Sequence, residues 1–313
     1  MATVLITGGT GMIGKAITKA LLEKDYEVIV LTRKASSHEL RAGSKLSFAE
    51  WNVEKRTIDE NAVAKADHII HLAGANLGDK RWTKKRKKEI VDSRVESGKL
   101  IVESLKRIAN KVRSVISASA IGWYGPDLSK TQSIAGRSFK ETDSAYNDFL
   151  GQTCKQWEDA IHPVTELGKK LVVLRTGIVL SREGGAIPKF ITPLKFGIAP
   201  ILGSGKQIIS WIHIDDLVRL YISAIENEKL SGVYNAVAPN PISNKDFVLT
   251  LAKTKNKFFI PFPVPSFVLK IVLGEMSIEV LKSATVSSEK IQRTEFQFLY
   301  PTINSAIQKI ISS

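Results

Sequence analysis

Cysteine is almost missing from this chain, which carries a single thiol, Cys154, among 313 residues. One cysteine excludes an internal disulfide framework and fits a reducing compartment. Zinc-finger spacings, RNA-binding aromatic motifs and low-complexity arginine segments are also missing, which argues against nucleic-acid binding. The first strand pattern begins by residue 3, which leaves no room for a signal or transit peptide. We therefore expect a cytoplasmic protein without a bound metal.

Long hydrophobic runs are missing as well. The most apolar late stretch, residues 258–274, is interrupted by Pro261, Pro263, Pro265 and Lys270. Prolines would leave backbone groups unpaired in lipid, so this stretch is a poor membrane span. The hydrophobic fraction of 43% and the charged fraction of 24% are ordinary for a globular protein. We expect no membrane partner.

The glycine-rich segment near the N-terminus is the most informative part of the sequence. A short apolar run stops at Gly8, and an amphipathic helix pattern begins beside Gly11 and Gly14. Glycines allow a tight turn, the approach of a phosphate to the backbone, and close packing of helix on strand. The free N–H groups and the dipole of the helix then face the anion. We predict a dinucleotide site whose pyrophosphate contacts come from Gly8, Thr10, Gly11, Met12, Ile13 and Gly14.

The end of the second strand pattern, residues 27–32, bears on which dinucleotide binds. Arg33 and Lys34 follow it, about 20 residues beyond the glycines. An acidic residue in this place binds the ribose 2′-hydroxyl of NAD, whereas a basic residue accommodates the 2′-phosphate of NADP. A guanidinium can hold that phosphate through two hydrogen bonds. Arg33 therefore favours NADP over NAD. The alternative is that Arg33 and Lys34 are ordinary exposed charges at the end of a strand.

Strand and helix patterns alternate over residues 1–180. This alternation predicts an α/β fold, with a Rossmann-type doubly wound parallel sheet and right-handed crossovers. We expect this Rossmann domain to be completed by residues 207–237. Residues 181–206 and 238–313 are then expected to form a smaller C-terminal α/β substrate-binding subdomain.

Two helix starts are marked in the second half of the chain. Residues 208–214 predict one strand, after which Asp215 is placed to cap a helix. Ser243 is placed to cap another helix, with Asp246 in its first turn. We expect these elements to help cover the open edge of the sheet and bury a small-molecule substrate.

Positive charge is concentrated in one block. The net charge is +14, and seven of the nine residues in 80–88 are basic. Such a block could contact the phosphates of a nucleic acid or an acidic surface. We favour the alternative, a solvated loop and helix start, so nucleic acid is not the expected partner.

Four segments together resemble the extended short-chain dehydrogenase/reductases, the sugar-nucleotide epimerase/dehydratase group. They are the glycine turn and residues 71–74, 117–120 and 211–216. Other segments are similar to the atypical subfamily often called epimerase family proteins: residues 81–82, 93–94, 119–125, 174–180 and 203–205. The resemblance covers almost the whole chain and implies a Rossmann domain, NADP binding and a smaller C-terminal substrate domain.

The resemblance also suggests where the middle of the cofactor lies. Small residues after a strand let the backbone approach a ligand at the carboxyl edge of the sheet. The further cofactor contacts expected there are Leu72, Ala73, Gly74, Arg94, Ser117 and Ser119. His71 stands at the same strand end, but we expect it to pack or to bond to the backbone rather than to catalyse.

The chain departs from the family pattern at the catalytic pair. The wider family uses a Tyr-x-x-x-Lys pair for acid–base chemistry, and the corresponding positions here are Leu150 and Cys154. Ser119 remains, and Arg94 stands where the family has an asparagine. Ser119 can donate a hydrogen bond to a carbonyl, and Arg94 can stabilise a developing oxyanion.

Two residues are candidates for the missing proton donor. Tyr124 follows the serine strand, although an aromatic residue in such a place more often shapes a pocket. Cys154 can have a depressed pKa beside a cation and a helix N-terminus. It can equally be a small buried hydrophobe, and both interpretations stay open. The catalytic candidates are therefore Ser119, Cys154, Tyr124 and Arg94.

The residues leave two functions open. The first is an NADP(H)-binding, epimerase/dehydratase-like oxidoreductase with a degenerate active site, acting on a small substrate such as a sugar nucleotide. The second is a non-catalytic NADP(H)-binding regulatory or sensor protein, which needs no proton relay. Either is compatible with a homodimer, and the fold class alone does not choose the reaction.

Overall fold

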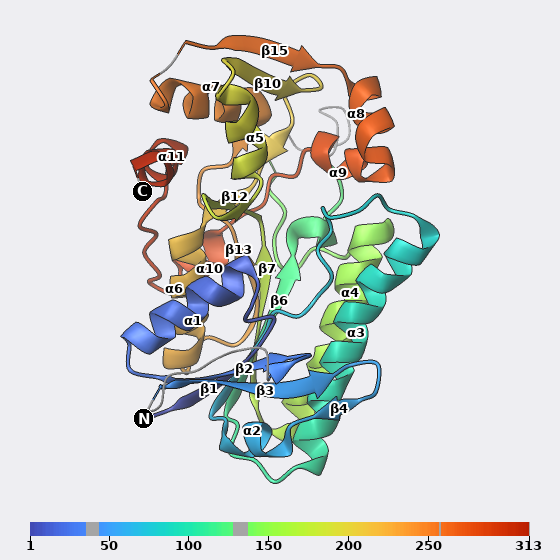
Figure 1. The fold of residues 1–313 in the computed structure, drawn as a ribbon, viewed down its shortest axis with the longest axis vertical. Coiled ribbons are helices and arrows are strands. Elements are labelled where there is room, and N and C mark those ends of the chain that lie inside the picture. The colour runs from blue at the N-terminus through green and yellow to red at the C-terminus, as the bar shows by residue number, and fades with distance from the viewer. Residues whose placement is uncertain (36–43, 128–136, 257, 313) are drawn as a thin grey trace.

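The computed structural model describes residues 1–35, 44–127, 137–256 and 258–312, and is built around one eight-stranded sheet (Figure 1). Its strands are β1 (Thr3–Thr7), β2 (Glu27–Thr32), β3 (Leu46–Asn52), β4 (Thr57–Ile58), β5 (His68–His71), β6 (Ser114–Ala120), β7 (Lys170–Thr176) and β13 (Gly232–Ala236). The spatial order is β13-β7-β6-β5-β1-β2-β3-β4. All neighbours are parallel except β3 and β4. The strand order reverses beside β1, where such sheets bind ligands.

Helices cover both faces of this sheet (Figure 1). α1 (Met12–Glu23) and α6 (Ile214–Glu226) pack on one face, and α3 (Lys84–Arg107) and α4 (Phe149–Ile161) pack on the other, with the short α2 (Glu60–Lys65). Successive residues of β1 alternate between the two cores, because Cβ atoms along a strand point to opposite faces. Val4 and Ile6 are buried on the α1 side, and Leu5 is buried on the α3 side. The predicted doubly wound parallel sheet is confirmed.

The second half of the chain builds a smaller unit beyond the carboxyl ends of the strands (upper part of Figure 1). It contains β8 (Ile178–Ser181), β9 (Gly184–Gly185), α5 (Ile187–Leu194), β10 (Ile198–Leu202), β11 (Ile208–Ile209), β12 (Trp211–His213), β14 (Ile242–Ser243), α7 (Asn244–Thr254), β15 (Ile260–Val264), α8 (Ser266–Leu273), α9 (Ser277–Leu281) and α11 (Ile303–Ser312). Trp211 and Phe247 lie fully within its own hydrophobic core. None of the described helices is long and apolar enough to cross a bilayer.

Parts of the chain cross the division expected from the sequence. β13 joins the main sheet, as expected for residues 207–237. The later helix α10 (Glu289–Gln292) also packs on the Rossmann half, since Ile291 is buried in the same core as α6. The expected single strand over 208–214 is divided at Ser210. Its hydroxyl donates to the Ala284 carbonyl at 2.8 Å and accepts from the Val286 N–H at 2.9 Å. The chain therefore changes sheets at Ser210, and β11 and β12 have different partners.

One of the two predicted helix caps is correct. Ser243 accepts from the Asp246 N–H and caps α7. The prediction for Asp215 is wrong, because α6 begins earlier and is capped by His213, whose Nδ1 accepts from the Asp215 N–H at 3.2 Å. Asp215 instead lies in the first turn, where its charge favours the helix dipole.

The turn between β1 and α1 gives a stability prediction. A Cβ at residue 14 would lie 2.4 Å from the Gly8 carbonyl oxygen, which is backbone and cannot move aside. We expect Gly14→Ala to lower the free energy of unfolding by about 1–3 kcal/mol through overpacking, measured by urea denaturation. Gly11→Ala is the matched control, because its nearest contact is 3.4 Å. Equal stability of both variants would contradict the packing argument.

Candidate functional site

Backbone geometry at the β1–α1 turn leaves space for a ligand beside Gly11. Gly8 has a φ of +70°, and a Cβ there would lie 2.9 Å from the Leu72 carbonyl carbon. Glycine is therefore required at positions 8 and 14 by the protein's own packing. At Gly11 the nearest atom to an added Cβ is 3.4 Å away, and both Thr10 and Gly11 are exposed. No described protein atom comes closer than 3.4 Å to the position of a Cβ at Gly11, so the space beside this glycine is open.

The N-terminus of α1 also offers hydrogen-bond donors. The N-cap residue is Gly11, and among the described residues no side chain caps this helix and no acidic residue lies in its first turn. A side chain caps each of α2, α3, α4, α6 and α7, whereas α5, α8 and the short α9 and α10 also lack such a cap. The first N–H groups of an α-helix have no partner within the helix. Those of Met12 and Ile13 therefore suit an anion such as a pyrophosphate.

The neighbouring strand ends are held by Thr7 and His71. The Thr7 Oγ1 accepts from the Leu72 and Ala73 N–H groups at 3.1 and 3.2 Å, and contacts His71 Nδ1 at 2.8 Å. Because both N–H groups donate to Thr7 Oγ1, the hydroxyl's own proton is left to donate to His71 Nδ1. The imidazole proton then lies on Nε2, which is 3.3 Å from the Ser97 hydroxyl. Burial lowers the pKa of His71 to about 3. His71 is thus a neutral structural group that fixes the backbone at Leu72 and Ala73.

Arg94 supports the next part of the same edge from α3. Its guanidinium carbon would lie 3.0 Å from a Cβ at Gly74, and its Nη1 donates to the Ala75 carbonyl at 3.1 Å. The guanidinium also lies over the Trp157 ring, 5.0 Å from the centroid. Burial lowers the pKa of Arg94 to about 10, which leaves it charged at neutral pH. Arg94 therefore places a positive charge directly under the Gly74 backbone.

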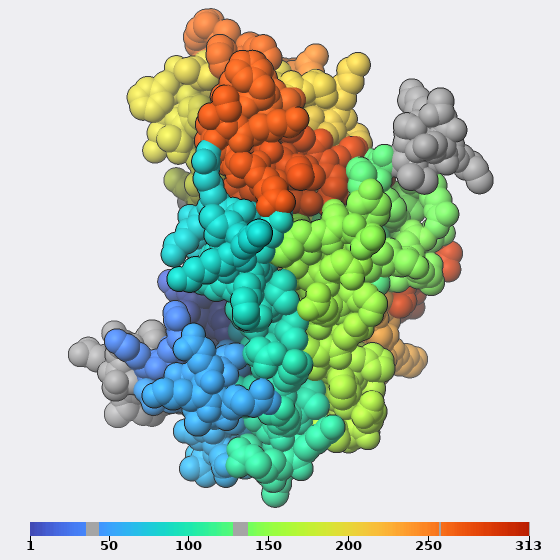
Figure 2. All heavy atoms as spheres, turned by 90° about the vertical axis from the view of Figure 1, so that its right-hand side faces the viewer, coloured from blue at the N-terminus to red at the C-terminus, as the bar shows by residue number. Residues whose placement is uncertain are grey.

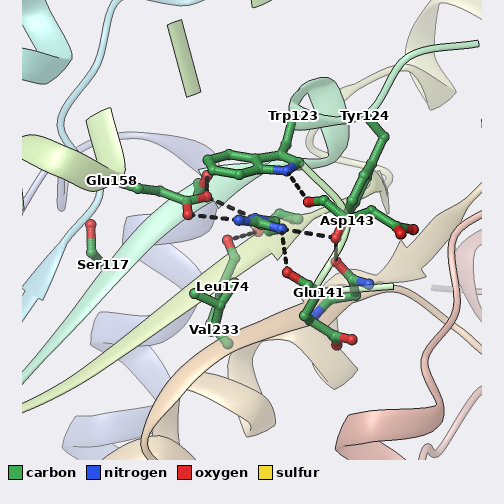
Figure 3. A network of polar contacts seen from close by, with 12 residues as sticks. Ser117, Trp123, Tyr124, Glu141, Asp143, Glu158, Leu174 and Val233 are labelled. Atoms are coloured by element: carbon green, nitrogen blue, oxygen red, sulfur yellow. Dashed lines mark hydrogen bonds and ion pairs between the residues drawn. The ribbon is translucent and has the colours of Figure 1, made fainter. Parts of the chain in front are cut away.

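A buried ion pair between Arg175 on β7 and Glu158 on α4 organises the far side of the site (Figure 3). Arg175 Nε and Nη2 donate to the two Glu158 carboxylate oxygens, each at 2.9 Å. Arg175 Nη1 donates to the Tyr124 hydroxyl at 3.1 Å and to the Glu141 carbonyl at 3.2 Å. The Trp123 ring stacks on the guanidinium, with its centroid 3.5 Å away. The arginine is only 2% exposed, so its charge depends on this one carboxylate.

Ser119 belongs to this network. Its hydroxyl donates to Glu158 Oε1 at 2.6 Å. Glu158 did not emerge from the sequence, although a signal was present, because it stands four residues after Cys154 on the same face of α4. The expected cofactor residue Ser117 lies on the same strand, buried and level with His71 across the β5–β6 pairing.

The structure favours the structural interpretation of Cys154. Burial raises the pKa of the Cys154 thiol to about 12, with Glu158 acting in the same direction, so the expectation of a depressed pKa is wrong. A Cβ at Gly122 would lie 3.2 Å from Leu150 Cβ and 3.6 Å from the Cys154 sulfur. The short turn over Ile121–Trp123 thus packs directly on the two residues that stand in the place of the usual catalytic pair.

Tyr124 is also unsuited to give a proton to a substrate. Its side chain is fully buried, and its hydroxyl donates to Asn235 Oδ1 at 2.7 Å while accepting from Arg175. Burial raises the pKa of Tyr124 to about 12. The ring stacks on Phe139, with centroids 5.1 Å apart. In this structure Tyr124 orients Arg175, and no contact places it at the strand edge beside Gly11.

The remaining predicted residues lie around the same edge of the sheet. Arg33 directly follows β2 and is exposed, one strand away from the glycine turn. Met12 faces the β8–β9 hairpin, because its sulfur would lie 3.0 Å from a Cβ at Gly184. Lys189 of α5 lies close to Gly78, 3.3 Å from a Cβ built there. The C-terminal unit therefore meets the Rossmann half on both sides of the predicted cofactor path.

Comparisons with known proteins agree with this arrangement. Residues 4–236 match the NAD dependent epimerase/dehydratase family, and residues 264–310 match a domain of unknown function (DUF1731). Epimerase family protein SSP1921 of Staphylococcus saprophyticus is 37% identical over 313 residues, which is 99% of this chain and 100% of that protein.

Two solved structures extend the comparison. The human epimerase family protein SDR39U1 (isoform 2) with NADPH has a TM-score of 0.84 and 27% identity, over 99% of each chain. A nucleoside-diphosphate sugar epimerase from Corynebacterium glutamicum has a TM-score of 0.76 and 30% identity, over 99% of this chain and 58% of that one. The resemblance identified from the sequence is confirmed.

The Arg175–Glu158 pair gives the second prediction. Glu158→Gln removes the only carboxylate that pairs with the buried guanidinium among the described residues, so we expect the free energy of unfolding to fall by about 3–5 kcal/mol. Asp159→Asn is the matched control on the same helix, where it breaks an exposed pair with Lys155 worth at most about 1 kcal/mol. Guanidinium unfolding curves measure both losses. Similar losses of unfolding free energy in the two variants would show that the buried pair stabilises the fold no more than the exposed pair does.

Proposed function

Since the chain belongs to the NAD dependent epimerase/dehydratase family, we propose that it is an NADP(H)-binding oxidoreductase or epimerase with a rearranged active site. The observation that carries this proposal is the uncapped N-terminus of α1 beside the open space at Gly11. Donors without a partner and a glycine without a packing reason are what a pyrophosphate site needs. Its substrate is a small molecule bearing an alcohol or a carbonyl group.

In this proposal the cofactor lies along the carboxyl edge of β2, β1, β5 and β6. Gly8, Thr10, Gly11, Met12 and Ile13 bind the pyrophosphate, while Leu72, Ala73 and Gly74 line the path toward Ser117 and Ser119. Arg94 supports this path with its positive charge below Gly74. Thr7 and His71 keep the Leu72–Ala73 backbone in place without touching the ligand.

The preference for NADP rests on Arg33. It is exposed at the end of β2, where a 2′-phosphate of a bound NADP(H) is expected, and a guanidinium can bind that phosphate with two hydrogen bonds. The similar human protein was crystallised with NADPH, which supports the same preference for this chain.

The reacting part of the site would use Ser119 and Glu158. A cofactor held along this path would supply hydride-transfer chemistry at the substrate carbon. In the oxidative direction, the substrate hydroxyl gives its proton to Ser119 Oγ as the Ser119 proton passes to Glu158 Oε1, 2.6 Å away. The reverse transfer protonates the oxygen of a reduced carbonyl. Arg175 stabilises the Glu158 carboxylate between these steps.

A second candidate function is a non-catalytic NADP(H) sensor. It is favoured by one observation, namely that the polar groups nearest to the reacting position are used internally. The Tyr124 and Cys154 side chains are buried, and the Ser119 hydroxyl already donates to Glu158. In such a protein, ligand binding would stabilise one arrangement of the two halves of the chain for a partner.

Cofactor selectivity is the third prediction. We expect NADPH to bind more tightly than NADH in calorimetric titration, and Arg33→Asp to weaken NADPH by about tenfold or more through loss of the charged 2′-phosphate contact. Arg107→Asp is the control, with the same charge change at the far end of α3. Equal affinity of the unmodified protein for NADPH and NADH would contradict the assignment of Arg33.

Turnover separates the two candidate functions and is the fourth prediction. The assay follows NADPH oxidation with a panel of sugar nucleotides, small aldehydes and ketones. We expect Ser119→Ala to lower the rate by about a hundredfold or more, as for a lost acid–base group, while NADPH still binds through the contacts at the β1–α1 turn. Failure of the whole panel, together with tight NADPH binding, would favour the sensor. Unchanged turnover in Ser119→Ala would eliminate the proposed role of the serine.

A further inference from the structure

Exposed apolar side chains are concentrated at one end of the molecule. Large examples are Phe258, which is 82% exposed, Phe196 at 79% and Ile271 at 67%. We name the set the apolar patch: Phe196, Ile198, Phe258, Ile260, Phe262, Phe267, Ile271 and Val272. Its members come from the end of α5, from β10 and β15 and from α8, which together form the top and upper right of Figure 1. Several large exposed apolar side chains on neighbouring segments are typical of an interaction surface.

The segments that carry the apolar patch are strongly cationic. Residues 186–209 and 242–274 contain eight lysines and one acidic residue, Asp246. Lys195 directly precedes Phe196, and Lys270 stands on α8 between Phe267 and Ile271, and all four side chains are exposed. An apolar surface interleaved with lysine fits a partner that is both apolar and negatively charged.

The basic block, residues 80–88, adjoins this surface. Arg81 donates through Nε to the Val272 carbonyl at 3.1 Å and through Nη2 to the Ile271 carbonyl, at the end of α8. Lys87 pairs with Glu275 at 2.6 Å. Figure 2 shows the orange segment that contains α8 seated directly on the cyan start of α3. The exposed Lys84 and Lys85 therefore extend the cationic surface beside the apolar patch.

Two features argue against a protein as the occupant. Pro261 and Pro263 alternate with Ile260 and Phe262 along β15, and the Ile260 N–H is used toward Gly197 on the β10 side. The outer edge of β15 thus has no N–H donor at the proline positions, so it is a poor template for strand addition. A second copy packed through the same patch in a two-fold dimer would bring lysines against lysines.

We propose that the apolar patch and the basic block together bind the surface of an anionic lipid bilayer. Phenylalanine and isoleucine side chains enter the boundary between headgroups and acyl chains, and the surrounding lysines contact anionic headgroups. A membrane needs no shape-complementary pocket, so separate protruding side chains from four elements suit it. The expectation of no membrane partner rested on the lack of one long apolar run for a spanning helix, whereas this surface is assembled from short segments that lie together only after folding.

Vesicle flotation with the purified full-length chain tests the proposal. The protein is expected to float with vesicles of equimolar phosphatidylcholine and phosphatidylglycerol and to stay at the bottom with phosphatidylcholine alone. The variant F267S/I271S should lower the partition coefficient by about tenfold or more through lost apolar burial. The variant K84E/K85E should lower the partition coefficient by about fivefold or more for each lysine. The partition coefficient of this variant should also depend less steeply on salt concentration.

The controls use exposed residues outside the surface. Leu299→Ser replaces an exposed apolar side chain, and K65E/K106E reverses two charges at the opposite end of the molecule, so both should float like the unmodified protein. Circular dichroism of every variant checks its folding. Absence of flotation with anionic vesicles, or equal loss in the controls, would overturn the proposal. The proposal would also be overturned if F267S/I271S changed the sedimentation coefficient but not flotation, since the patch would then be a contact between copies of this chain.

Discussion

The buried Arg175 guanidinium is the constraint on which the carboxyl side of the sheet depends. A charge that is 2% exposed must have a counter-charge and must satisfy its other donors, because desolvation otherwise costs several kcal/mol. Glu158 supplies the charge, and the Tyr124 hydroxyl and the Glu141 carbonyl accept from Nη1. This requirement ties α4, β7 and the segment before α4 into one rigid group. The position of Ser119 follows from it, because its hydroxyl donates to the same carboxylate.

The site has an intact binding half and a rearranged reacting half. At the β1–α1 turn, the required glycines and the uncapped helix match what a dinucleotide needs. At the other end, Leu150 and Cys154 are covered by the turn that contains Gly122, so an apolar contact occupies the place where the wider family has its acid–base pair. The residues proposed for cofactor binding and those proposed for catalysis are therefore separable, because different elements support them.

The basic block shows how one sequence feature can have two physical roles. Arg86 is buried and pairs with Glu89, and Lys87 and Arg81 hold the region around α8 against the start of α3. The contacts of Lys87 and Arg81 join the two halves of the chain. The remaining exposed lysines add their charge to the apolar surface beside them. The expectation of a solvated loop and helix start therefore fits the exposed lysines of this block but not Arg86, which is buried.

Local sequence patterns determined the Rossmann sheet, the glycine turn, the cap of α7 and the residue at the end of β2, because periodicity and turn chemistry act over a few neighbouring residues. The replacement at Leu150 and Cys154 was also visible, since it depends on spacing alone. Tertiary structure decided which buried polar groups meet. Glu158 and Arg175 are 17 residues apart, and Tyr124 and Asn235 are 111 apart. Burial then set the pKa values of Tyr124 and Cys154, and burial depends on the packing of the whole chain.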